Sequence, residues 1–140
     1  MGKINAKTRI EKGEKIKPLI KDDKPTNQLP PKFSFRYLSF GSQYCFSKLT
    51  KDEKIGFANK IYQLSQMTWL EIHNANRHTV GTEIIDRNSI RAELPKNITL
   101  DVTLHAIRFH KLKPMVGFKD HDGTFYILWF DPKLKLYNHG

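Results

Sequence analysis

The chain has a single cysteine, Cys45, and no long apolar run among its 140 residues. One cysteine excludes an intramolecular disulfide and a cysteine-based zinc cluster, and it is typical of proteins that fold in a reducing cytosol. No stretch of about 18 apolar residues is present to span a membrane, and residues 1–9 lack the apolar segment of a signal peptide. We therefore expect a cytoplasmic protein with no membrane partner.

The motifs that mark many enzyme classes are also missing. The sequence has no glycine-rich phosphate loop, no Gly-x-Ser-x-Gly nucleophile turn and no paired carboxylates in an obvious cleft. Its six histidines are scattered, and none is spaced from another as metal ligands on a helix are. We therefore expect neither a metal ion nor another cofactor.

Positive charge is present in excess. The chain has 24 lysines and arginines against 14 acidic residues, which gives a formal net charge of +10. Such a surplus favours a polyanionic partner, most often a nucleic acid. The alternative is a lysine-rich genome whose proteins are all basic, in which case the charge says nothing about function.

Length and composition indicate one domain with its own core. A chain of 140 residues falls within the range of roughly 100–200 that is typical of one domain, and 39% of it is hydrophobic. Residues 1–32 differ, because lysine and proline are frequent there and no helical or strand period lasts. We predict a flexible basic arm over residues 1–32, either a solubilising extension or a nucleic-acid contact, and one α+β domain over residues 33–140.

Two capping boxes mark the helical part of the domain. In each box a threonine can accept a hydrogen bond from the third helical N–H, while a glutamate three residues later reaches back to the cap. The first box begins at Thr50 and precedes an apolar stripe at helical spacing, which predicts a helix of about four turns. The second begins at Thr68 and predicts a short helix that ends near residues 74–76.

Alternating apolar residues predict strands on both sides of the helices. These strands cover residues 33–40, 98–110, 116–119 and 124–130. Residues 76–99 show no lasting period, and short helical turns over 82–85 and 86–91 are the most regular structure that they suggest. A strand, two helices and then sequential strands favour an α+β fold, with helices packed on one face of an antiparallel β-sheet.

The dipeptide of Asp122 and Gly123 is the strongest local signal in the chain. Asp-Gly suits a two-residue type I′ turn, which needs a positive φ at both positions. This turn would place Lys119 opposite Tyr126 in the hairpin. Alternation would then turn both side chains, together with His121, away from the core and toward solvent.

The preceding strand adds charge to the same face. Arg108 and His110 alternate with two apolar residues, so burial of the apolar pair would turn the basic pair outward. Lys111 and Lys113 follow in the loop. Cations of this kind hold a phosphate and stabilise its developing charge, and imidazole and phenol groups can exchange protons. The alternative is an ordinary solvent face, because any sheet in a basic protein exposes Lys, His and Tyr.

Two further basic residues, Arg77 and His78, follow the second predicted helix. They can bind phosphate, although helix ends also collect such residues to complement the helix dipole. RNA is the favoured substrate for the whole basic surface. Its 2′-hydroxyl can act as an internal nucleophile, so that cleavage would need no metal.

In layout, residues 33–130 resemble the RelE/ParE superfamily of small bacterial toxins. Those proteins are basic chains of similar size, in which helices follow a first strand and a terminal antiparallel meander carries the active surface. Residues 118–131 resemble the closing hairpin of the family in pattern. RelE-like members cut messenger RNA on the ribosome without a metal, using Arg, Lys, His and Tyr side chains of the sheet.

The resemblance implies roles for individual residues. Phosphate binding would fall to Arg108 and Lys119, and proton transfer to His110, His121 or Tyr126. We therefore predict a bacterial or phage RNA-binding protein, in the first place a metal-independent endoribonuclease acting on mRNA, free or ribosome-bound, with an antitoxin-like protein as a further partner. The alternative is a non-catalytic accessory factor that binds nucleic acid or protein through the same face.

Overall fold

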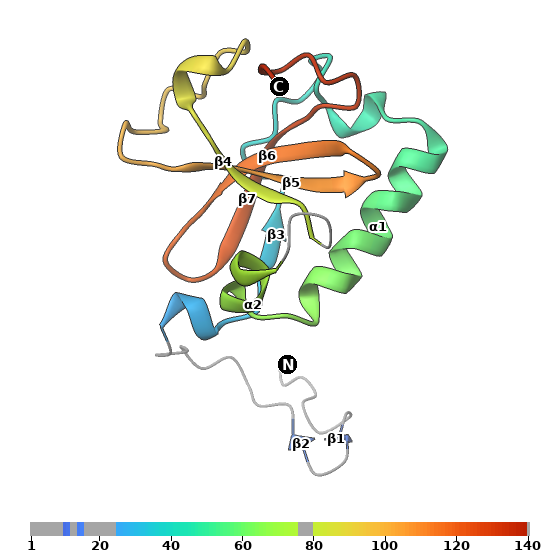
Figure 1. Ribbon diagram of the computed structural model, residues 1–140, viewed down its shortest axis with the longest axis vertical. Coiled ribbons are helices and arrows are strands. Elements are labelled where there is room, and N and C mark those ends of the chain that lie inside the picture. The colour runs from blue at the N-terminus through green and yellow to red at the C-terminus, as the bar shows by residue number, and fades with distance from the viewer. Residues whose placement is uncertain (1–9, 12–13, 16–24, 76–79, 140) are drawn as a thin grey trace, which may run out of the picture.

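A computed structural model describes residues 10–11, 14–15, 25–75 and 80–139 (Figure 1). Its main element is a five-stranded sheet with the strand order β3-β7-β6-β5-β4. The strands are β3 (Lys32–Ser34), β4 (Thr82–Ile85), β5 (Leu104–His110), β6 (Lys113–Lys119) and β7 (Thr124–Phe130). All neighbouring pairs are antiparallel except β3 and β7, which are parallel. A short ribbon of β1 (Ile10–Glu11) and β2 (Glu14–Lys15) precedes the sheet.

Two helices begin at the predicted capping boxes. In α1 (Lys51–Ser65) the Thr50 hydroxyl accepts from the backbone N–H of Glu53, whose carboxylate accepts from the Thr50 N–H at 2.8 Å. The same reciprocal pair at Thr68 begins α2 (Trp69–Asn74). The α+β fold predicted from the sequence is therefore confirmed. No helix in the described part of the chain is long and apolar enough to cross a membrane.

Both helices pack on one face of the sheet. Their buried side chains, Leu64 on α1 and Trp69 and Ile72 on α2, share a core with strand residues that include Phe125 and Ile127. This helix-covered face is where the apolar stripe of α1 was expected to be buried. Helices on a single face of a sheet agree with the predicted arrangement.

The opposite face of the sheet was predicted to be open to solvent, but in the structure it is covered. The segments around Tyr44, Leu136 and Tyr137 cover it and form a second core with β-strand residues such as Leu128 and Trp129. Leu128 and Trp129 are 0% and 1% exposed. Strand β7 is therefore buried on both sides, and a basic solvent face cannot form along its length.

The hairpin of β6 and β7 exists, but the predicted turn and register are wrong. Its loop has three residues, closed by the Asp120 N–H donating to the Thr124 carbonyl at 3.0 Å. Of these three residues only Gly123 has a positive φ, +87°. The Asp120 carboxylate accepts from the N–H of Asp122 and of Thr124, and this side-chain cap favours the longer loop.

One extra loop residue shifts the pairing by one position. Lys119 lies opposite Phe125, and Tyr126 lies opposite Phe118. Paired residues share a face, so Lys119 belongs to the helix-covered side, while Tyr126 packs with the second core on the other side. The predicted convergence of Lys119 and Tyr126 on one face is therefore wrong.

Other boundaries also differ from those predicted. Residues 82–85 form a strand and not a helical turn, and of residues 33–40 only the first two belong to a strand. Before that strand, Leu29 is 7% exposed, and its carbonyl accepts from the Trp69 N–H at 3.0 Å. Leu29 lies within the predicted flexible arm, yet it is buried in the fold.

Candidate functional site

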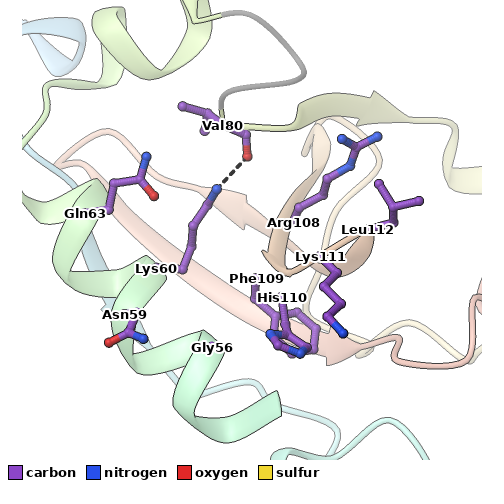
Figure 2. Close-up of a pocket in the computed structure, with 10 residues that line it drawn as sticks. All are labelled: Gly56, Asn59, Lys60, Gln63, Val80, Arg108, Phe109, His110, Lys111 and Leu112. Carbon is purple, nitrogen blue, oxygen red and sulfur yellow. Dashed lines mark hydrogen bonds between the residues drawn. The ribbon is translucent and has the colours of Figure 1, made fainter. Parts of the chain in front are cut away.

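A cationic pocket lies between α1, the end of β5 and the residues that lead into β4 (Figure 2). It has a volume of about 540 Å³. The lining residues are Gly56, Asn59, Lys60, Gln63, Val80, Arg108, Phe109, His110, Lys111 and Leu112. Three of the ten are lysine or arginine, one is histidine, and none is acidic. Such a lining favours an anionic ligand.

Lys60 reaches across the pocket from α1 to the segment before β4. Its Nζ donates a hydrogen bond to the Val80 carbonyl at 2.8 Å, as Figure 2 shows. Burial lowers the pKa of Lys60, and the positive charge of Arg108 lowers it further. None of the ion pairs within the described residues includes Lys60. Because an ammonium has three donors, a bound anion can accept from Lys60 and offset its lost hydration.

Two glycines make room for the basic side chains of β5. A Cβ on Gly56, in the middle of α1, would overlap the ring of His110. A Cβ on Gly81 would overlap the side chain of Arg108. Glycine within a helix costs about 0.5–1 kcal/mol relative to alanine, and here that cost is offset by the close packing of an imidazole against the helix backbone.

The end of β5 is irregular where it reaches the pocket. The pairing of β5 with β6 shifts between Arg108 and His110, which marks a β-bulge. In the turn that follows, Lys111 has φ = +55°, a left-handed conformation that is uncommon outside glycine. Bulges and such strained residues occur often at binding sites, where they direct a side chain.

The structure brings three of the predicted site residues together, Arg108, His110 and Lys111. Lys113 was predicted to bind phosphate with them. Instead its Nζ forms an ion pair with the Glu53 carboxylate at 2.6 Å, so a carboxylate already neutralises its charge.

The other predicted residues lie elsewhere. Tyr126 stacks on Phe118 with the ring centroids 5.1 Å apart, and burial and the nearby Asp120 raise its pKa. His121 is exposed in the β6–β7 loop. Lys119 lies over the Trp69 ring on the helix-covered face. Arg77 and His78 are outside the described residues. His110, His121 and Tyr126 therefore do not form the single catalytic group that was expected.

Sequence reasoning missed Lys60. It lies one helical turn after Gly56, and a glycine inside an otherwise regular helix can mark the close approach of another side chain. That glycine was the available signal, because a lysine on a helix of a lysine-rich protein is not distinctive by itself.

No metal centre accompanies the cationic pocket in the described part of the chain, where no three His, Cys, Asp or Glu side chains are grouped to hold an ion. Lys60, Arg108 and Lys111 line one hollow, and their positive charges favour an anionic ligand. Comparisons of this chain with protein-family models, with curated proteins and with solved structures gave no match.

Proposed function

We propose that the cationic pocket binds phosphate groups of a nucleic acid, with single-stranded RNA as the favoured partner. The observation that carries this proposal is the meeting of Lys60, Arg108 and Lys111 in a hollow that has no acidic residue among those lining it. Arginine can hold a phosphate through two parallel hydrogen bonds, and lysine adds a compact point charge.

The shape of the site supports a single strand over a duplex. Recognition in the major groove of a duplex requires a helix or ribbon that protrudes into it. Single-stranded RNA instead presents unstacked nucleotides that enter concave sites. A pocket of about 540 Å³ is of a size to take such a nucleotide with its phosphate.

The Lys60→Met variant tests this proposal, because methionine keeps the apolar stem and removes the charge. We expect its affinity for an RNA of about 12 nucleotides to fall about fivefold, the loss of roughly 1 kcal/mol from one charge-assisted contact. The slope of log affinity against log salt should fall by about 0.7. Fluorescence anisotropy with labelled RNA at several salt concentrations measures both.

Lys51→Met is the matched control, since Lys51 is exposed on the same helix and does not line the pocket. It should leave the affinity nearly unchanged. Equal losses in the two variants would show that only the total charge of the protein matters, and the proposed site would be wrong.

A second candidate function is cleavage of the bound RNA, which is the activity that the resemblance implies. The observation in its favour is that His110 lines the same pocket as Arg108 and Lys60. In this scheme the His110 imidazole takes the proton from the 2′-hydroxyl, whose oxygen forms a bond to phosphorus. The bond to the 5′-oxygen breaks, and that oxygen receives a proton from the Lys60 ammonium. The products are a 2′,3′-cyclic phosphate and a 5′-hydroxyl.

The His110→Gln variant separates binding from cleavage. If His110 is the base, the variant should lose cleavage by about 100-fold or more while it retains most of its RNA affinity. Gel analysis of RNA incubated with EDTA, with and without ribosomes, measures this. Wild-type protein that cleaves only after a divalent metal is added, or not at all, would exclude this second function and leave RNA binding as the activity.

A further inference from the structure

A basic cluster lies apart from the cationic pocket and consists of His73 on α2, His105 on β5 and Lys119 on β6. The Lys119 Nζ lies 3.2 Å from the His73 Nε2 and 4.9 Å from the centre of the Trp69 ring. The His73 ring stacks on Trp69 at 5.6 Å and lies 5.6 Å from the ring of His105. Three segments that are distant in sequence thus bring three basic side chains into contact.

The basic cluster has no acidic partner among the described residues, because none of their ion pairs includes any of its three members. Burial lowers the pKa of Lys119 and of His73, and Lys119 lowers that of His73 further. Burial, His73 and Lys119 together lower the pKa of His105 to about 4. The folded protein therefore disfavours the charged form of both imidazoles, which lie beside a partly desolvated ammonium.

The basic cluster and the cationic pocket lie along the same strand. His105 is four residues before Phe109, a pocket residue on the same helix-covered face of β5, which is about 13 Å at the usual rise of a strand. The cluster contacts α2 and the pocket contacts α1, and both helices cover the same face of the sheet. One extended polyanion can therefore reach both.

We propose that the basic cluster is a second phosphate-binding subsite for the same RNA chain, and that it takes up a proton when the phosphate binds. This inference rests on the proposed function and extends it. A phosphodiester beside His73 supplies the negative charge that the cluster lacks, and it favours the imidazolium over the neutral ring. The groups that act on the two imidazoles are each other and Lys119, all of which attract the same anion.

Proton uptake predicts how RNA affinity changes with pH. The free protein lowers the pKa of His73 and His105, and a bound phosphate would raise it, so lower pH favours the complex. We expect the wild-type affinity for an RNA of about 12 nucleotides to rise about tenfold between pH 7.5 and about pH 5.5. In the His73→Gln variant this rise should shrink to about twofold, as in Lys119→Met.

His121→Gln is the matched control, because it removes an exposed histidine outside the cluster and should keep the full rise with falling pH. His110→Gln is the second control, since His110 lines the cationic pocket and can also take up a proton. A rise that disappears in His110→Gln and persists in His73→Gln would overturn the second subsite. NMR titration of the imidazoles adds a direct readout, in which RNA should raise the pKa of His73.

The proposed function and this inference fail in different ways. If the wild-type protein does not bind RNA at either pH, both are wrong. If it binds RNA and loses affinity in Lys60→Met, yet His73→Gln and Lys119→Met behave like the wild type at every pH, the cationic pocket stands and the basic cluster is no phosphate site.

Discussion

The Gly117→Ala variant is expected to lose about 4 kcal/mol of its free energy of unfolding, close to the largest effects seen for a single substitution. A Cβ on Gly117 would overlap the backbone carbonyl of Tyr126 on the neighbouring strand and would lie 3.1 Å from the Cα of Ile127. Both are backbone atoms, so no side-chain rotation relieves the overlap. The β6 and β7 backbones would have to separate in the middle of the sheet.

The position of Gly117 explains why this close approach exists. The pairing of β6 with β7 shifts between Val116, which lies opposite Trp129, and Gly117, which lies opposite Ile127. Strand β7 therefore has one extra residue, Leu128, at this bulge. Only a residue without a side chain fits where the carbonyl of the partner strand points at it. The bulge also realigns Val116 with Trp129, a pair that the second core buries.

Urea unfolding followed by the fluorescence of the buried Trp69 and Trp129 measures this loss. Gly41→Ala is the matched control. Gly41, unlike Gly117, has a positive φ, +82°, and a Cβ there would have no atom within 4 Å. The control should cost about 1 kcal/mol from its backbone conformation alone. A Gly117→Ala variant that is no less stable than this control would contradict the proposed overlap.

The sequence predicted those elements whose signals are local. The capping boxes at Thr50 and Thr68 specify where α1 and α2 begin, because both hydrogen-bonding partners lie within one turn of each other. Alternation located most of β6 and β7 for the same reason. The helix-covered face followed from the apolar stripe of α1.

The register of the hairpin was beyond local signals. Asp-Gly at residues 122 and 123 suits a two-residue turn, but Asp120 supplies a carboxylate that caps a three-residue loop instead. A single residue of slip moved Lys119 to the opposite face of the strand pair from Tyr126. The bulge at Gly117 then shifts the pairing back, so that Val116 lies opposite Trp129, as a two-residue turn would also have placed it. The apolar periodicity of the sequence does not indicate this second shift.

The candidate site was partly predictable. Arg108 and His110 were predicted from their alternation with two apolar residues, and Lys111 from the loop that follows. Their proximity in the pocket follows from this local order. The proton-transfer group assembled from His110, His121 and Tyr126 required a solvent face across β5, β6 and β7. Alternation assigns side chains to two faces, yet it cannot reveal that later segments cover the second face.

Glu53 caps α1 and also pairs with Lys113 at the edge of the cationic pocket. Its replacement therefore tests both the stability of the fold and the charge beside the pocket. The residue is 6% exposed. Its carboxylate caps α1 and pairs with the Lys113 Nζ at 2.6 Å. Burial raises the pKa of Glu53, but hydrogen bonds from Lys113 and Thr50 outweigh burial, and the net pKa lies below its ordinary value. The carboxylate is therefore charged at neutral pH.

We expect Glu53→Gln to lower the free energy of unfolding by about 2 kcal/mol at neutral pH, a figure reduced from that of a fully buried pair because Lys113 is partly exposed. A group with a lowered folded-state pKa stabilises above its ordinary pKa and loses that contribution as pH falls through the folded value. The difference between wild type and variant should therefore shrink in acid. Urea unfolding at several pH values measures it.

The same substitution should tighten RNA binding by about twofold to threefold, because it releases the Lys113 charge beside the pocket. Lys113 pairs across the strands with His110, which lines that pocket. Glu71→Gln is the matched control, since Glu71 makes the same capping contact on α2 while exposed. It should cost less than about 1 kcal/mol. Equal destabilisation by both variants would show that the ion pair of Glu53 with Lys113 contributes nothing to stability. Unchanged RNA affinity in Glu53→Gln would show that the freed Lys113 does not reach the RNA.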